Sequence, residues 1–163
     1  MVWSTPRLVG VCAAALALAG LGTALASEQW GGLVPCPLCL WERWPYRVAI
    51  AVGVLAIALP RKPVFWLLGI VVLASVGLGA THVGVELGLW PSPLPMCSAP
   101  KLPIGGSLAE RFAALPALPS KPCDEPVYLF RWLPISMAQM NLLFSAGCGW
   151  ALLAFLRGEG RNA

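Results

Sequence analysis

Four long apolar segments constrain this chain more than any other feature of its sequence. About 30 Å of hydrocarbon needs roughly 20 apolar residues to be crossed at the helical rise of about 1.5 Å per residue. Because lipid offers no hydrogen-bonding partners, each such segment has to satisfy its own backbone groups as a helix. The expected spans cover residues 8–26, 40–59, 64–83 and 137–156. The sequence therefore predicts an all-α integral membrane protein, a four-helix bundle that forms one domain over residues 1–163.

The composition excludes a water-soluble enzyme. Charged residues make up only 11% of the chain and hydrophobic residues 58%, whereas soluble domains are about 25% charged. The formal net charge is +4 and no basic block is present, so we expect no binding to nucleic acid. The expected surroundings are a lipid bilayer.

Basic residues near the ends of the apolar segments predict the orientation. Those in short connections fall on one side of the bundle: Arg7, Arg61, Lys62, Arg157 and Arg161. The positive-inside rule assigns that side to the cytoplasm, so both termini are expected there and the loops 27–39 and 87–135 outside. Five tryptophans fall near the outer boundary, where an aromatic belt is typical: Trp30, Trp41, Trp44, Trp90 and Trp132.

The first apolar segment has a second interpretation. Arg7, the apolar run and the small residues Ala24 and Ala26 before Ser27 also resemble a cleavable signal peptide, although the run is long for that role. Both interpretations leave the two outer loops on the same side of the membrane.

The long outer loop holds ten of the sixteen prolines and is expected to be largely non-helical. Its exception covers residues 107–115, where Ser107 and Glu110 form a capping-box pattern. This pattern predicts a short amphipathic helix, which could lie on the bilayer surface or pack against the bundle.

The six cysteines divide by location. Cys12 and Cys148 fall within apolar spans, where a free cysteine behaves as a small hydrophobe. The other four fall in the outer loops, on the side where disulfides persist: Cys36, Cys39, Cys97 and Cys123. Four cysteines allow three pairings, and only one of these keeps each pair within its own loop.

The Cys36-Pro37-Leu38-Cys39 motif is the strongest chemical signal. Its ring is too small to constrain much chain, and the spacing is more typical of redox-active or metal-binding pairs. A zinc site of four thiolates stays open, although the second pair lacks the tight spacing. Pro37 suits the first turn of a helix, which puts Cys36 near its cap. Arg43 then shares a face with Cys39, and we expect this guanidinium and the helix N-terminus to lower the Cys39 pKa.

A thiolate at the mouth of a bilayer is well placed to meet a lipid-soluble electron acceptor. Quinones are the abundant molecules of that class, so a quinone is the hypothesis for the acceptor. The alternative is that both cysteine pairs are structural staples of a non-catalytic membrane scaffold.

Three motifs resemble a known family. They are the run from Cys36 through Glu42-Arg43-Trp44-Pro45, the segment His82-Val-Gly-Val-Glu86 with Cys97 after a proline-rich stretch, and Cys123-Asp-Glu leading to Ser136-Met137-Ala138 and Asn141. Together they are similar to the signature of the bacterial disulfide bond formation protein B (DsbB) family, over roughly residues 8–156.

The resemblance implies a quinone-linked thiol oxidase that supports disulfide bond formation. A Cys97–Cys123 disulfide would accept electrons from the dithiol of a periplasmic thioredoxin-like oxidase resembling DsbA, with Cys97 forming the mixed disulfide. The electrons would pass to Cys36 and Cys39, with Cys39 facing the quinone. Arg43 matches the family arginine associated with quinone binding. The implied cofactor is a quinone from the membrane pool, ubiquinone in preference to menaquinone, and the implied location is the bacterial inner membrane.

His82 has two possible roles. At the outer end of the third span it could donate a hydrogen bond to a quinone carbonyl, or it could pair with Glu86 four residues later. Asn141 is interpreted as a helix–helix hydrogen bond.

Two further alternatives stay open beside the scaffold. A vitamin K epoxide reductase-like oxidase does similar chemistry, but in that family the loop cysteines precede the Cys-x-x-Cys motif, the reverse of the order in this chain. A carrier that reduces outer proteins would need activated cysteines within the membrane, where only Cys12 and Cys148 lie.

Overall fold

The computed structural model describes residues 5–97, 107, 121–130 and 132–161. Within this part of the chain there are helices and no strands, so the expected all-α fold is confirmed. The elements are α1 (Thr5–Gln29), α2 (Pro37–Ala58), α3 (Lys62–Glu86), a 3-10 turn η1 (Pro95–Cys97) and α5 (Met137–Arg161). Of the amphipathic helix expected over residues 107–115, all but Ser107 lies outside the described residues.

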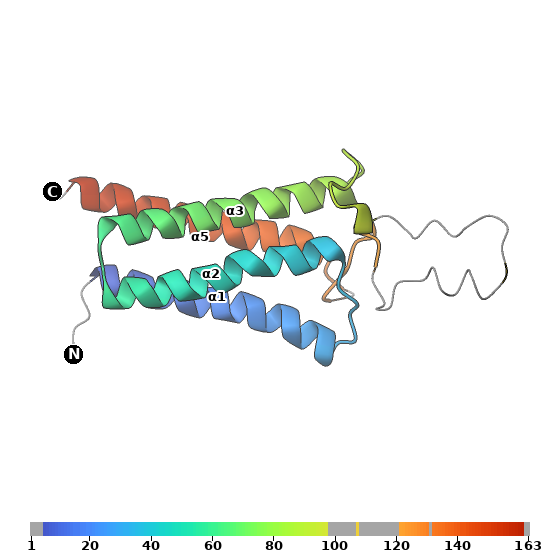
Figure 1. The fold of residues 1–163 in the computed structure, drawn as a ribbon, viewed down its shortest axis with the longest axis horizontal. Helices are drawn as coiled ribbons and strands as arrows, with labels where there is room; N and C mark the ends of the chain where they lie inside the picture. Colours follow the sequence, from blue (N-terminus) through green and yellow to red (C-terminus); the bar gives the residue numbers. More distant parts are fainter. Residues whose placement is uncertain (1–4, 98–106, 108–120, 131, 162–163) are drawn as a thin grey trace.

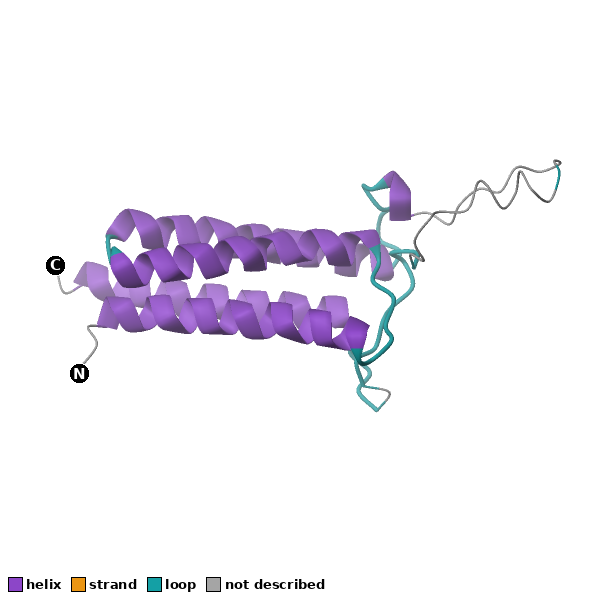
Figure 2. Ribbon diagram, turned by 60° about the horizontal axis from the view of Figure 1, so that its bottom comes forward, coloured by secondary structure: helices purple, strands orange, loops and turns teal. Residues whose placement is uncertain are grey.

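The four long helices run side by side, as Figure 1 shows. The two ends of the described chain and the turn between α2 and α3 gather at one end of the bundle, and the connections that carry the loop cysteines gather at the other (Figures 1 and 2). The two predicted outer loops therefore share one end. Close packing joins α1 to α2, α2 to α3 and α3 to α5, whereas α1 and α5 touch little.

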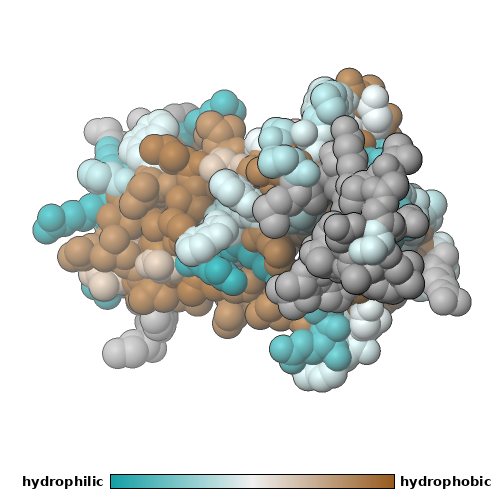
Figure 3. Space-filling model, turned by 45° about the vertical axis from the view of Figure 1, so that its right-hand side comes forward, coloured by the Kyte–Doolittle hydropathy of each residue, from teal (hydrophilic) through white to brown (hydrophobic). Residues whose placement is uncertain are grey.

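Three helices, α1, α3 and α5, are long and apolar enough to cross a membrane. The first turns of α2 carry Glu42, Arg43 and Arg47, although the rest of that helix is apolar. The helices also expose many large apolar side chains, such as Leu73 at 70% and Trp150 at 75%. Figure 3 shows a broad hydrophobic surface over the helices, as lipid contact requires.

Glycines bring α1 and α2 into close contact. A Cβ atom on Gly10 would lie 2.9 Å from the carbonyl oxygen of Gly53, and one on Gly53 would lie 2.8 Å from the backbone nitrogen of Ala14. Small residues at such a crossing let two backbones approach, which is how helices associate in lipid.

Buried hydrogen bonds tie α5 to its neighbours. Ser75 on α3 and Ser145 on α5 bond at 2.9 Å, and the Tyr46 hydroxyl on α2 donates to Oδ1 of Asn141. The interpretation of Asn141 as a helix–helix contact is thus confirmed. At the start of α5, Ser136 and Gln139 form a reciprocal capping box, with both bonds at 3.2 Å.

Candidate active site: two cysteine pairs and a cavity

The two cysteine pairs meet at one end of the bundle. Cys97 and Cys123 form a disulfide with their Cα atoms 5.0 Å apart, whereas Cys36 and Cys39 are free thiols. Cys36, Cys97 and Cys123 nevertheless belong to one buried apolar cluster, at 2%, 3% and 1% exposure, together with Leu38. The loop disulfide therefore packs against the beginning of α2.

The local sequence explains the place of Cys36. Pro37 opens α2, as expected, and Cys36 is the N-cap residue. Its sulfur accepts a hydrogen bond of 3.1 Å from the backbone N–H of Cys39. A cysteine sulfur here occupies the position that an oxygen of Ser or Asp more often takes at a helix start.

The two thiols of this motif differ in acidity. A hydrogen bond from the Cys39 side chain, helped by its backbone N–H, lowers the pKa of Cys36. The same hydrogen bond, with burial, raises the pKa of Cys39 above its usual range. The expectation of a lowered Cys39 pKa is wrong, because Cys39 donates its hydrogen bond to Cys36 at the cap position and is itself partly buried.

Arg43 pairs with a carboxylate and not with the Cys39 thiol, contrary to the expectation. It forms a two-pronged ion pair with Glu28 at the end of α1, with N–O distances of 3.0 and 2.6 Å. Arg43 is 8% exposed, and its Nε is buried without a hydrogen-bond partner. A buried guanidinium needs a carboxylate more than a thiol does, which explains the pairing.

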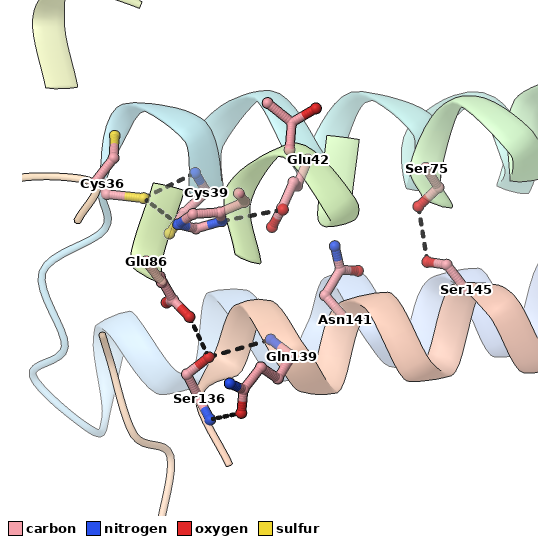
Figure 4. A network of polar contacts seen from close by, with 12 residues as sticks. Cys36, Cys39, Glu42, Ser75, Glu86, Ser136, Gln139, Asn141 and Ser145 are labelled. Atoms are coloured by element: carbon pink, nitrogen blue, oxygen red, sulfur yellow. Dashed lines mark hydrogen bonds and ion pairs between the residues drawn. The ribbon is translucent and has the colours of Figure 1, made fainter. Parts of the chain in front are cut away.

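His82 links α3 to α2. Its Nε2 lies 3.4 Å from the Cys36 sulfur, and its Nδ1 lies 3.1 Å from Oε1 of Glu42. The pairing of His82 with Glu86 that the spacing suggested is not formed. Glu86 instead accepts a 2.5 Å hydrogen bond from the Ser136 hydroxyl (Figure 4).

A cavity of about 280 Å³ opens beside these residues, between α1, α2 and α5. Its walls are largely apolar, and its polar lining includes Glu28, Glu42 and Arg43 as well as Asn141. Cys39 lines it too, whereas neither Cys36 nor His82 is among its lining residues. The volume is close to the lower end of small-molecule pockets, about 300 Å³.

Two residues of the cavity lining each carry a buried hydrogen-bond donor that lacks a partner. Nε of Arg43 and Nδ2 of Asn141 are the buried side-chain atoms without a bond among the described residues. A buried donor without a partner costs about 1–3 kcal/mol. A ligand with carbonyl oxygens would relieve that cost, so the donor set fits a quinone.

A second cavity of about 270 Å³ lies deeper in the bundle and is lined almost entirely by apolar atoms. It shares Tyr46 and Phe144 with the first cavity. Cys12 and Cys148 line this deeper cavity as free thiols, away from the polar cluster, in keeping with their interpretation as small apolar residues.

Sequence reasoning missed Glu28 and Glu42. Both are carboxylates at or within an apolar helix, where an ionisable residue is costly and marks a partner or a site. That signal was present, but it did not say which neighbour each carboxylate meets.

Comparison with known proteins identifies the family of this chain. The family described as "Disulfide bond formation protein DsbB" matches residues 6–155. A protein of Rickettsia prowazekii (strain Madrid E), "Uncharacterized protein RP370", is 31% identical over 144 residues, covering 86% of this chain and 80% of that protein. "Disulfide bond formation protein B" of Pasteurella multocida (strain Pm70) is 30% identical over 132 residues, covering 75% of this chain and 74% of that protein.

No solved structure matches the chain. The family match nevertheless covers most or all of each long helix and all four cysteines of the site. The chain belongs to the DsbB family of disulfide bond formation proteins and is thus part of the machinery that makes disulfide bonds.

Proposed function

We propose that this protein is a membrane thiol:quinone oxidoreductase that reoxidises a periplasmic thioredoxin-like, DsbA-like dithiol oxidase. One observation carries the proposal: a loop disulfide packs on a reduced Cys-x-x-Cys pair, and one cysteine of that pair lines a cavity. This order of groups is what electron flow from a protein dithiol to a small acceptor requires.

The first half of the proposed cycle is thiol–disulfide exchange. A thiolate of the partner attacks Cys97, which breaks the Cys97–Cys123 bond and forms a mixed disulfide. The second partner thiolate releases the oxidised partner and leaves two loop thiols. The Cys123 thiolate then attacks Cys36 of a Cys36–Cys39 disulfide, and Cys97 resolves the new bond, which restores the loop disulfide and leaves the inner pair reduced.

The oxidation states of the two cysteine pairs in the structure are those expected at the end of the first half of the proposed cycle. The loop disulfide is intact, and the inner pair is in the dithiol form. Two electrons and two protons then have to leave Cys36 and Cys39 as their disulfide re-forms. A bound quinone supplies this chemistry by taking up both and leaving as the quinol.

His82 and Glu42 are suited to move the first proton. Nε2 of His82 is 3.4 Å from the Cys36 sulfur and can accept its proton. Glu42 accepts from Nδ1 at 3.1 Å, which holds the ring in the required tautomer. His82 thus acts on Cys36 and not on the quinone, because neither residue lines the cavity.

Arg43 is proposed to hold the quinone. Glu28 holds its guanidinium in place, and the unpaired Nε lies in a residue that lines the cavity. The deeper apolar cavity, which adjoins the first at Tyr46 and Phe144, suits an isoprenoid chain. Ubiquinone remains the expected quinone, with menaquinone as the alternative.

The proposed location is the bacterial inner membrane, with both termini cytoplasmic and the cysteine loops periplasmic. The end of the bundle that holds both chain ends also holds Arg61, Lys62 and Arg157, which supports this orientation.

Quinone reduction by the purified protein in nanodiscs tests the proposal, with a reduced thioredoxin-fold dithiol as electron donor. The parent and a Cys148→Ser control are expected to turn over, and Cys39→Ser is expected to be inactive. An inactive parent, tried with ubiquinone and menaquinone analogues, would instead favour the scaffold with structural disulfides.

A further inference from the structure

Three metal-binding side chains converge beside the cavity. The sulfurs of Cys36 and Cys39 and a ring nitrogen of His82 all lie within 4.8 Å of one another. Cys36 and His82 are 2% and 3% exposed. The cluster draws on α2 and α3, which are packed together, so its geometry is set by the bundle.

The spacing fits a tetrahedral ion. Zinc binds cysteine sulfur at about 2.3 Å and histidine nitrogen at about 2.0 Å, which puts two such ligands about 3.5 Å apart. The Cys36 sulfur lies 3.4 Å from Nε2 of His82. This pair therefore needs almost no movement to share one ion, and the Cys39 sulfur is already within reach.

The surroundings of His82 are those of a metal ligand. Nδ1 lies 3.1 Å from the Glu42 carboxylate, which leaves Nε2 free to face the sulfurs. A carboxylate behind a histidine ligand fixes the ring and raises its basicity, and such outer partners are typical of zinc sites. Two thiolates also balance the charge of a divalent ion.

An ion can reach the cluster from the cavity. Cys39 is partly exposed and lines the cavity of about 280 Å³, so this side of the cluster is open. The side toward Cys36 is closed by the Cys97–Cys123 disulfide. Three protein ligands leave a fourth position, which water from the cavity can occupy.

We infer that the dithiol form of this protein binds one soft divalent cation, with Zn²⁺ as the representative ion, through Cys36, Cys39 and His82. The site exists only while the two cysteines are reduced, because a Cys36–Cys39 disulfide has no thiolate to offer. Binding displaces the two thiol protons to solvent. The regulatory part rests on the proposed function: an occupied site withholds both sulfurs from exchange and stops turnover until the ion leaves.

Metal titration of the full-length protein in detergent tests the site directly. A background with Cys12, Cys97, Cys123 and Cys148 replaced by serine leaves only the inner pair. Co²⁺ is added to the reduced protein without oxygen, and Zn²⁺ is then used to displace it. One Co²⁺ per chain, with a thiolate-to-cobalt absorption band, is the expected result.

Oxidation provides a control that changes no residue. The same preparation with a Cys36–Cys39 disulfide is expected to bind no Co²⁺. Cys36→Ser is expected to weaken the thiolate band, Glu42→Gln to weaken binding about 10–100-fold, and His82→Ala, which removes a ligand, to weaken it further. The inference is overturned by an absence of saturable binding, by equal binding in the oxidised form, or by equal affinity in His82→Ala.

The test separates the site from the proposed function. Binding is measured without quinone or partner, and quinone reduction by the parent is measured with a chelator present. A parent that binds the ion but does not reduce quinone keeps the site and loses the function. Turnover that added Zn²⁺ leaves unchanged at saturating occupancy overturns the regulatory part.

Discussion

The two cysteine pairs share one buried cluster but are held in different ways. Cys36 and Cys39 lie at the start of a helix, where the backbone N–H of Cys39 donates to the Cys36 sulfur and His82, which is held by Glu42, faces that sulfur. Cys97 and Cys123 are held by their own covalent bond and by one backbone hydrogen bond of 3.3 Å from Cys123 to Cys97. The acidity of the inner pair is therefore set by its surroundings, whereas the loop pair contributes a bond to be broken.

The largest effect is expected from removing the loop disulfide alone, which tests whether the two cysteine pairs have separate roles. Cys97→Ser is expected to abolish oxidation of the protein dithiol, with a loss on the order of 10³-fold or more, because the bond that accepts its electrons is gone. Reduction of quinone by a small dithiol such as dithiothreitol, which can reach the inner pair through the cavity, is expected to continue. Both rates are followed by quinone absorbance, and loss of both would mean that the pairs do not act separately.

His82→Asn tests the proton path at the inner pair. Without the ring nitrogen that faces Cys36, oxidation of the reduced inner pair by quinone is expected to slow about 10²-fold, the lower range for a general base. Rapid-quench trapping of the four thiols measures this step, and its rate should rise with pH in the variant as hydroxide replaces the base. Asp124→Asn, an exposed change near the loop disulfide, serves as the control. A step of unchanged rate would remove His82 from the path.

Arg43→Ala is expected to weaken quinone use far more than the single-turnover oxidation of the partner. Its removal leaves the partly buried Glu28 without its partner, which costs about 1–3 kcal/mol of stability. The KM for quinone should rise at least tenfold, and thermal unfolding in nanodiscs reports the stability change. Arg47→Ala is the matched exposed control. Equal loss in both half-reactions would argue against a quinone role for Arg43.

The smallest expected effect is a shift in thiol titration. Hydrogen bonding lowers the pKa of Cys36, so its thiolate persists to lower pH than an ordinary cysteine thiolate and is lost as pH falls through the lowered pKa. As the pH is raised, thiolate absorbance in the ultraviolet should show one early step, at lower pH than an ordinary cysteine, in the reduced Cys97→Ser/Cys123→Ser protein. This step should be absent after Cys36→Ser. An early step that survives Cys36→Ser and disappears in Cys39→Ser would reverse the assignment.

The sequence predicted the helices better than their partners. The length of each apolar run led to all four long helices, three of which are long and apolar enough to cross a membrane, and Pro37 led to the start of α2. The helices continue past the predicted spans, as α3 does to Glu86, because helical hydrogen bonding does not stop where the residues become polar. The boundary at Met137 was predicted as observed.

The contacts between helices could not be predicted in the same way. Glu42 and Arg43 are neighbours in the chain, yet one meets His82 of α3 and the other meets Glu28 of α1. Which partner each finds depends on how α2 is rotated between two other helices, and a single sequence contains no measure of that rotation. The position of Cys36 at the helix cap was predicted, but the direction of the hydrogen bond between the Cys36 and Cys39 side chains, which lowers the pKa of Cys36, was not.

The weak contact between α1 and α5 has a consequence for exchange with the membrane. Both cavities are lined by these two helices, and the other three neighbouring pairs in the ring are closely packed. The bundle is therefore an open arrangement of four helices with one weakly packed pair, α1 and α5, rather than a closed ring. A long apolar molecule can enter sideways from the lipid when α1 and α5 separate, while the α1–α2, α2–α3 and α3–α5 contacts stay intact. Entry to the cavities and stability of the fold therefore depend on different helix contacts.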